Sequence, residues 1–291
     1  MINKSTLDKF DLTGKNAVVT GGGTGLGYAM TRALLLMGAK VMIAARREDA
    51  LRDSVAKLKK ECSTDLIMYQ TVDLNDRQNV RQFAQKAQEA LNGVDIFIGN
   101  AAYGLFKPFE TVTDEDLDQC LRTNFTANFE LTRHFLPAMR EKKWGRILFS
   151  SSAGSVLSGS TGMSVYSATK AALNSLVKTV ADEASQYGVN ANTLVIGCYM
   201  TEMLANFKNE LDANGGGEAA RALIERLETN NMIGRLGNPR ELEGAVQLLT
   251  SDAGSFITGQ SIPVDGGMTV MAWANEPVKN PVMPSYCLQD C

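Results

Sequence analysis

Short apolar segments rich in β-branched residues alternate along the chain with longer segments in which apolar residues recur at helical spacing. The short segments predict strands at 16–20, 40–45, 66–71, 94–98, 146–150, 189–196 and 261–264. Helices are predicted at 25–37, 48–61, 76–91, 114–142, 164–187 and 239–250, with a kink at Pro137. Such alternation indicates an α/β protein whose seven-stranded parallel sheet is doubly wound and flanked by helices on both faces.

We expect a single domain over 1–272 and an irregular C-terminal arm over 273–291, because three prolines interrupt that tail. A lid over the substrate is predicted at about 198–232, where residues 206–217 are polar and rich in glycine.

Composition excludes several functions. The net charge of −3 and the lack of a basic stretch argue against nucleic-acid binding. No apolar stretch reaches the ~18 residues of a membrane span, and residues 1–15 have no apolar signal core. The five cysteines form no CxxC pair and His134 is the one histidine, so we expect no metal site, reduced thiols and a cytoplasmic protein.

Tyr166 and Lys170 are the most informative pair in the sequence. They lie one helical turn apart and project from the same side of the predicted helix. A nearby ammonium group favours phenolate, so Lys170 is expected to lower the pKa of Tyr166 toward the range useful for acid/base catalysis.

A glycine-rich turn follows the first predicted strand. Residues 20–27 read T-G-G-G-T-G-L-G, and glycines there allow positive φ angles and close approach of an anion. Unpaired N–H groups at the helix start would face a pyrophosphate, as in a dinucleotide-binding Rossmann fold. The glycine spacing is G-x-x-x-G-x-G rather than the common G-x-G-x-x-G fingerprint, and the alternative is an ordinary tight turn between strand and helix. The turn residues expected to hold a cofactor are Gly21, Thr24, Gly25, Leu26 and Gly27.

The end of the second strand bears on cofactor choice. Ala45 stands where an acidic residue would bind a ribose hydroxyl, and Arg46 and Arg47 follow it. Two guanidinium groups match a 2′-phosphate, so we expect NADP(H) to be preferred, with NAD(H) as the alternative. The competing interpretation is that both arginines are solvated charges at the start of a helix.

Taken in order, these motifs resemble those of the short-chain dehydrogenase/reductase family over roughly residues 10–270. The resemblance also rests on Asp73, on Asn100 and Ala101 after the fourth strand, and on Asn124 and Ser151. Residues 150–154 read S-S-S-A-G, which places the family's serine at Ser151 rather than at a neighbouring serine.

The resemblance implies roles for these residues in an oxidoreductase acting on a carbonyl or secondary alcohol. Ser151 would bind the substrate oxygen, and Tyr166 would exchange its proton. Tyr166 and Lys170 would also bind the cofactor, Lys170 at the nicotinamide ribose, and Asn124 would hold a water. Asp73 and Leu74 would contact adenine, Asn100 and Ala101 the adenosine ribose, and Gly197 and Thr201 the nicotinamide side. Singly, Asp73 could instead cap a helix and Asn124 could satisfy a local carbonyl. The resemblance also suggests a homodimer or homotetramer.

One departure from the family pattern lies after the sixth strand, where Ile196 replaces the usual proline and predicts a more flexible turn. Tyr199 and Met203, with Met200, Leu204 and Phe207, are expected to form an apolar wall for a neutral small-molecule substrate. For Leu204 and Phe207, packing onto the core is an equal alternative.

Two other functions remain open. One is a regulatory protein that binds nucleotide without turnover, although the full set of Asn124, Ser151, Tyr166 and Lys170 argues against it. The other is an epimerase or dehydratase, whose different glycine turn and larger substrate domain this sequence lacks.

Overall fold

The computed structural model describes residues 4–157, 161–201, 204–205, 209, 217–271, 283–284 and 286–287. Its strands form one parallel sheet in the order β3-β2-β1-β4-β5-β6-β7. Their bounds are β1 Asn16–Thr20, β2 Lys40–Ala45, β3 Ile67–Thr71, β4 Ile96–Gly99, β5 Gly145–Ser152, β6 Val189–Ile196 and β7 Ser261–Val264. The predicted doubly wound, seven-stranded parallel sheet is therefore confirmed, with strand ends shifted by at most two residues.

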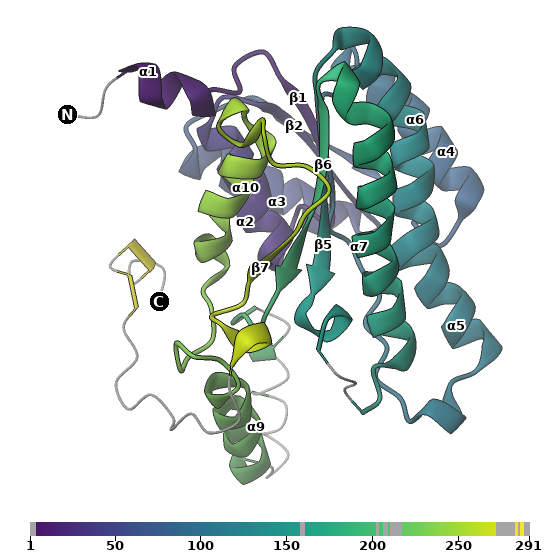
Figure 1. Ribbon diagram of the computed structural model, residues 1–291, viewed down its shortest axis with the longest axis vertical. Helices are drawn as coiled ribbons and strands as arrows, with labels where there is room; N and C mark the ends of the chain where they lie inside the picture. Colours follow the sequence, from purple (N-terminus) through teal and green to yellow (C-terminus); the bar gives the residue numbers. More distant parts are fainter. Residues whose placement is uncertain are drawn as a thin grey trace.

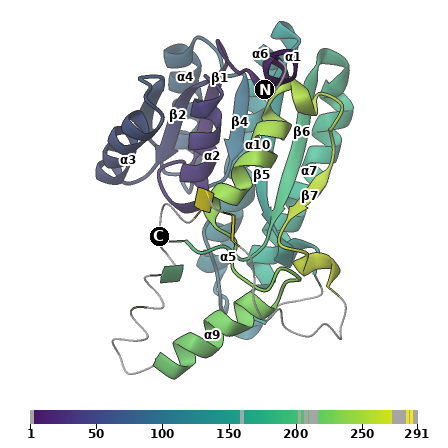
Figure 2. The same ribbon diagram turned by 90° about the vertical axis from the view of Figure 1, so that its left-hand side faces the viewer.

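Helices cover both faces of the sheet. Their bounds are α1 Lys4–Leu7, α2 Gly25–Leu36, α3 Glu48–Glu61, α4 Arg77–Leu91, α5 Asp114–Leu121, α6 Ala127–Lys142, α7 Ser164–Ala184, α9 Gly217–Thr229 and α10 Glu243–Thr250. Helices α4, α6 and α7 pack on one face, and α2, α3 and α10 pack on the other (Figures 1 and 2). None of the helices in the described part of the chain is long and apolar enough to cross a membrane.

The two layers of the core follow from the alternation of side chains along each strand. In β1, Val18 points into the core formed with α4, α6 and α7, whereas Ala17 and Val19 point into the core formed with α2, α3 and α10. All three side chains are fully buried, which explains the continuous apolar run in the sequence.

The direction of winding reverses at β1. The chain adds β2 and β3 on one side of β1 and then places β4 on the other side. In such sheets the carboxyl ends of the two strands at the reversal border a ligand-binding crevice. The functional site is therefore expected beyond Thr20 and Gly99, which are paired in the sheet.

The predicted helix at 114–142 is correct in extent but not in regularity. A π-helical turn over Arg122–Thr126 separates α5 from α6, and Asn124 lies fully buried within it. Such wide turns often occur at functional sites because they redirect a side chain. The segment expected to be a polar lid also contains α9, an amphipathic helix that was not predicted.

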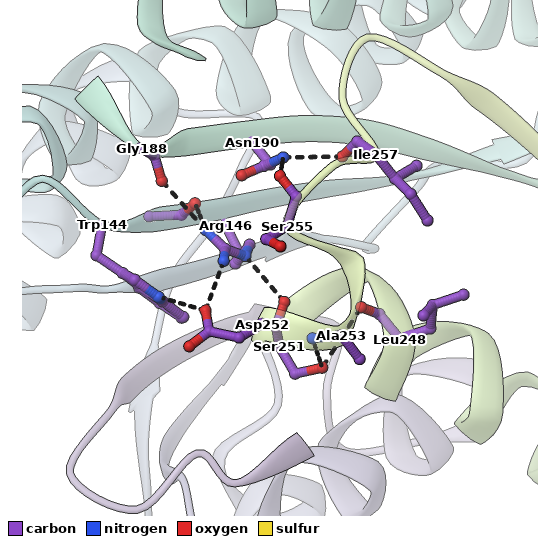
Figure 3. Close-up of polar contacts among 11 residues, drawn as sticks. Trp144, Arg146, Gly188, Asn190, Leu248, Ser251, Asp252, Ala253, Ser255 and Ile257 are labelled. Atoms are coloured by element: carbon purple, nitrogen blue, oxygen red, sulfur yellow. Dashed lines mark hydrogen bonds and ion pairs between the residues drawn. The ribbon is translucent and has the colours of Figure 1, made fainter. Parts of the chain in front are cut away.

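The opposite, amino-terminal edge of the sheet is closed by a polar cluster around Arg146, whose side chain is buried (Figure 3). Its guanidinium donates to the carbonyl oxygens of Gly145, Gly188 and Ser251 and to the Asp252 carboxylate, at 2.9–3.2 Å. Arg146 also lies 4.3 Å from the centre of the neighbouring Trp144 ring.

The described part of the C-terminal arm packs against its own chain. The carbonyl oxygen of Tyr286 accepts a hydrogen bond from Arg240 at 3.1 Å, and the Cys287 side chain is fully buried. Arg240 belongs to the short helix η6 (Pro239–Leu242) that precedes α10.

Candidate active site

The glycine turn between β1 and α2 is built as the sequence suggests. Gly21 and Gly25 adopt positive φ angles of 65° and 52°, which side chains other than glycine rarely tolerate. A Cβ atom on Gly27 would lie 2.0 Å from the Gly21 carbonyl oxygen, so any side chain there would force the turn open.

The start of α2 has no side-chain cap. Thr24 precedes the helix, and its side chain makes no capping hydrogen bond to the first turn. Thr201, after β6, lies close by, since a Cβ on Gly25 would be 3.7 Å from the Thr201 methyl carbon. Helix amides at an N-terminus attract phosphate groups, so this turn, with Leu26 in it and Thr201 opposite, fits a pyrophosphate.

Asn100 fixes the edge of the crevice rather than pointing freely into it. Its side-chain nitrogen donates to the Thr20 carbonyl at 3.2 Å, and its side-chain oxygen accepts from the Ser150 hydroxyl at 3.0 Å. The amides of Asn100 and Ala101 both donate to the Thr20 hydroxyl. These contacts join the ends of β1, β4 and β5 beside the glycine turn.

The residues predicted to contact the adenosine half of the cofactor differ in how exposed they are. Arg46 and Arg47 are both exposed at the end of β2, and among the described residues neither side chain has a hydrogen bond or ion pair. Leu74 is buried in the core beneath α4. Asp73 is exposed, and its carboxylate accepts a hydrogen bond from the Asn75 amide. The residue that caps α4 is Asp76, so the alternative role of Asp73 as that cap is wrong.

Lys170 is buried on α7 beneath Tyr166. Its ammonium nitrogen donates to the Ser150 carbonyl at 2.6 Å and lies 5.6 Å from the centre of the Tyr166 ring. The two side chains therefore lie together at the carboxyl edge of β5, as their spacing in the helix predicted.

The expected lowering of the Tyr166 pKa is wrong for this structure. Burial raises the pKa of Tyr166 above its ordinary value, with the Ser152 hydroxyl acting weakly in the opposite direction. Burial also lowers the pKa of Lys170 to about 8. Removal from water disfavours both charged forms, and this effect outweighs the attraction that the one-turn spacing suggested.

Ser151 begins a chain of buried hydrogen bonds. Its hydroxyl lies 3.0 Å from the hydroxyl of Ser155 and 3.2 Å from the Lys170 carbonyl. Ser155 gives its own proton to the Ser152 carbonyl and accepts from Asn174 at 2.9 Å. Ser151 has one hydroxyl proton, which the Lys170 carbonyl or the Ser155 hydroxyl can accept, and this proton can be redirected to a substrate oxygen.

Asn124 holds the loop that follows β4. Its side-chain oxygen accepts from the Tyr103 amide at 2.7 Å, and its side-chain nitrogen donates to the Tyr103 carbonyl at 3.1 Å and to the Thr169 hydroxyl at 3.1 Å. The alternative in which Asn124 satisfies a nearby carbonyl is thus observed. Thr169 precedes Lys170 in α7, so the same amide also connects this loop to the helix that carries the Tyr/Lys pair.

The predicted substrate wall is only partly supported. Tyr199 is 9% exposed, packs in the core on the α2 side and donates its hydroxyl to the Val264 carbonyl at 3.0 Å. Its burial weighs against the substrate contact expected of it. Met200 is exposed, and Met203 and Phe207 lie outside the described residues.

Ile196 lies within the sheet, and the greater flexibility expected after it stays a prediction. It is buried and pairs with Val264 of β7, and the amide of Gly197 donates to the Val264 carbonyl. The sheet therefore holds the backbone at the position where the resemblance led us to expect a proline.

Sequence inspection missed Ser155, Asn174 and Tyr103, which position the predicted residues. Asn174 lies one helical turn after Lys170, a spacing that could have revealed it as a further polar residue on the same face. Tyr103 could not be found in this way, because its contribution is made by backbone atoms.

A doubly wound parallel sheet with a glycine turn at its first strand and a buried Tyr/Lys pair beside it defines a dinucleotide-binding α/β protein. The family model described as "short chain dehydrogenase" matches residues 15–212. The chain belongs to the short chain dehydrogenase family.

The chain is similar to known proteins over most of their length. The chain is 30% identical to a tropinone reductase homolog of Arabidopsis thaliana, covering 92% of this chain and 98% of that one. It is 31% identical to the 3-oxoacyl-[acyl-carrier-protein] reductase of Rickettsia conorii, covering 90% and 99%.

Two solved structures have closely similar folds. One is a 3-oxoacyl (acyl-carrier-protein) reductase from Agrobacterium tumefaciens with NADP bound, with a TM-score of 0.82, 28% identity and coverage of 92% of this chain and 100% of that one. The other is the L-sorbose reductase of Gluconobacter frateurii complexed with NADPH and L-sorbose, with a TM-score of 0.84, 26% identity and coverage of 91% and 100%.

Proposed function

We propose that the protein is an NADP(H)-dependent oxidoreductase that interconverts a carbonyl compound and a secondary alcohol. The observation that carries this proposal is the placement of Tyr166 above the buried ammonium of Lys170, at the carboxyl edge of the sheet. The family's reductases, including relatives whose names specify tropinone-related and 3-oxoacyl substrates, support the same class of reaction.

The residues around the crevice fit the cofactor. The glycine turn, the open start of α2 and Thr201 would hold the pyrophosphate, and Arg46 and Arg47 would hold a 2′-phosphate with no carboxylate at Ala45 to repel it. The similar structures with NADP and NADPH support this preference. A bound dinucleotide supplies or accepts the hydride.

The chain's own residues would handle the proton. In the reductive direction Ser151 turns its hydroxyl from Ser155 to the substrate oxygen, and Tyr166 donates a proton to that oxygen as negative charge develops. The Tyr166 pKa, raised by burial, suits a proton donor. Protonated Lys170 would stabilise the phenolate that remains, and Asn124 keeps the adjoining loop in place.

The first test replaces Tyr166 with phenylalanine. Consumption of NADPH with a panel of ketones and aldehydes should fall by about 10²–10⁴-fold in Y166F, while the Kd for NADPH should change much less, because the glycine turn and the start of α2 would hold the phosphates. Wild-type protein that binds NADPH but turns over no carbonyl compound would favour the regulatory alternative.

A second test addresses cofactor choice. The double variant R46A/R47A should bind NADPH at least about 100-fold more weakly, since two charge-assisted hydrogen bonds worth about 1.5–3 kcal/mol each would be lost. Its affinity for NADH should be unchanged. A wild-type preference for NADH would overturn the assignment.

We further propose that the protein is a cytoplasmic homodimer or homotetramer. Its four described cysteines are free thiols, and Leu117, Leu121 and Phe129 leave apolar surface exposed along α5 and α6. Light scattering coupled to size exclusion would give the subunit number, and a monomer at micromolar concentration would contradict the proposal.

A further inference from the structure

We propose that Phe106 is a specificity-determining residue, whose ring forms an aromatic surface that selects carbonyl compounds carrying a flat ring next to the carbonyl group. This inference rests on the proposed function, because it assigns a substrate class to the same site.

The position of the Phe106 ring is the first observation. Its centroid lies 6.1 Å from that of Tyr166, with 27° between the ring planes. Phe106 is nevertheless 67% exposed, so most of its apolar surface is open to solvent beside the proposed proton donor. We expect a flat substrate ring to stack on that exposed surface next to Tyr166, because aromatic rings favour offset stacking.

The loop that carries Phe106 is fixed on both sides of the ring. Leu105 is 3% exposed and faces the core. The amide of Lys107 donates to the Gly162 carbonyl at 2.9 Å, which joins the loop to the segment leading into α7. Upstream, Asn124 holds both backbone groups of Tyr103. The ring is therefore presented by an ordered backbone, which reduces the entropy lost when a ligand binds.

Gly104 allows the ring to take this position. A Cβ atom at Gly104 would lie 3.0 Å from a carbon at the edge of the Phe106 ring, closer than most real contacts. The ring therefore folds back over the glycine toward Tyr166 instead of extending away from the loop.

Charges near the loop are already paired, which favours a neutral ligand. The ammonium of Lys107 lies 2.5 Å from the Asp116 carboxylate, and Arg235 forms an ion pair with Glu241 at 2.7 Å. Each is a cation that could otherwise bind a negatively charged substrate. Because both cations are paired, we assign the selection of substrate to the Phe106 ring rather than to a charged side chain.

Phe109 provides a matched control. It lies three residues further along the same loop and is 78% exposed, but within the described chain it makes no ring contact with Tyr166. Removing it deletes a similar apolar side chain without touching the proposed surface.

The experiment measures kcat/KM with NADPH for acetophenone, cyclohexyl methyl ketone and 2-octanone, which have equal numbers of carbon atoms. We expect wild type and F109A to prefer acetophenone, and F106A to lose that preference by about tenfold, as expected for one aromatic pair with its buried area. F106Y should retain the preference and F106L should retain only part of it. The Kd for NADPH and the elution volume should match those of wild type in all variants.

Several results would overturn the inference. They are an equal loss for all three ketones, an equal effect of F109A, a weaker Kd for NADPH in F106A, or a change in its subunit number. Thermal shifts of the NADPH complex by acetophenone separate this inference from the proposed function. A shift in wild type that is lost in F106A, without turnover of any ketone, would support the aromatic surface and refute the reductase; no shift and no turnover would refute both.

Discussion

The two edges of the sheet each bury a cation, but they surround it differently. At the amino edge, Arg146 donates to three carbonyl oxygens and a carboxylate and lies against Trp144 (Figure 3). At the carboxyl edge, the ammonium of Lys170 has, among the described residues, one carbonyl within hydrogen-bond distance and a phenol ring nearby.

This difference separates a structural charge from a functional one. Arginine keeps its proton at any ordinary pH, so many partners can hold it and its role is to join strands β5 and β6 to the turn before β7. Burial lowers the pKa of Lys170 to about 8. A lysine with few partners can therefore change charge near neutral pH, and it keeps donors free for a ligand.

The largest effect is expected for Lys170→Met, which should lower kcat/KM by at least about 100-fold, since it removes the charge beside Tyr166, the proposed general acid. The free energy of unfolding of K170M, compared with wild type, should depend on pH. Below pH 8 the folded and unfolded lysine are both protonated, and burial of the charge destabilises wild type. Between pH 8 and 10.5 the folded state loses its proton first, so wild type gains stability relative to K170M as pH rises.

The measurement is urea unfolding of both proteins across this range. The difference in unfolding free energy should change by roughly 3 kcal/mol in favour of wild type. A difference that does not vary with pH would show that Lys170 is not buried as a charge.

Arg146→Met should mainly affect stability. It removes a buried donor from three backbone carbonyls, so we expect a loss of about 2–3 kcal/mol in the free energy of unfolding. The kcat of the folded fraction should change by less than about twofold, because the site lies at the other edge of the sheet. R146K should recover only part of the stability. If R146M kept the stability of wild type but had a much lower kcat, Arg146 would not be a purely structural residue.

Asn174→Ala tests whether the hydrogen-bond chain to Ser151 positions that hydroxyl. We expect the kcat of N174A to fall about 5–10-fold with little change in KM. The double variant S155A/N174A should lose no more kcat than either single variant, because the two residues act as a unit. Asn190→Ala is the matched control: Asn190 donates to the carbonyls of Ser255 and Ile257 at the amino edge, and its loss should lower Tm without lowering kcat.

The smallest effect is expected for Asp252→Asn. The Asp252 side chain is 65% exposed, so the variant should lose less than about 1 kcal/mol, and the loss should shrink in high salt. Thermal unfolding at low and high ionic strength would measure it. A loss as large as that of R146M would mean that the carboxylate, rather than the carbonyl oxygens, stabilises the arginine.

Local patterns were enough to predict the sheet and the glycine turn. Strand β1 is a continuous apolar run because both of its faces are buried, and the turn needs glycine at Gly21 and Gly25 for reasons of backbone geometry alone. Tyr166 and Lys170 could be paired from sequence because helix geometry fixes residues four apart.

Features that depend on depth or on distant contacts could not be predicted. The pKa of Tyr166 rises because of burial, which spacing in a helix does not reveal. The sequence marks Phe106 as one more apolar residue, and its exposure is set by the anchoring of its neighbours. Tyr199 looked like a substrate contact because it follows β6, whereas its ring completes the core.

The wide turn at Arg122–Thr126 has one more residue than an α-helix would need to connect α5 with α6. A one-residue deletion there would leave a regular helix, with the apolar stripes of both flanking segments still aligned to the sheet. The extra residue is not needed to pack the flanking helices on the sheet, whereas the hydrogen bonds between Asn124 and Tyr103 depend on it. Relatives that lack this insertion would therefore have to secure the loop over their substrate by another means.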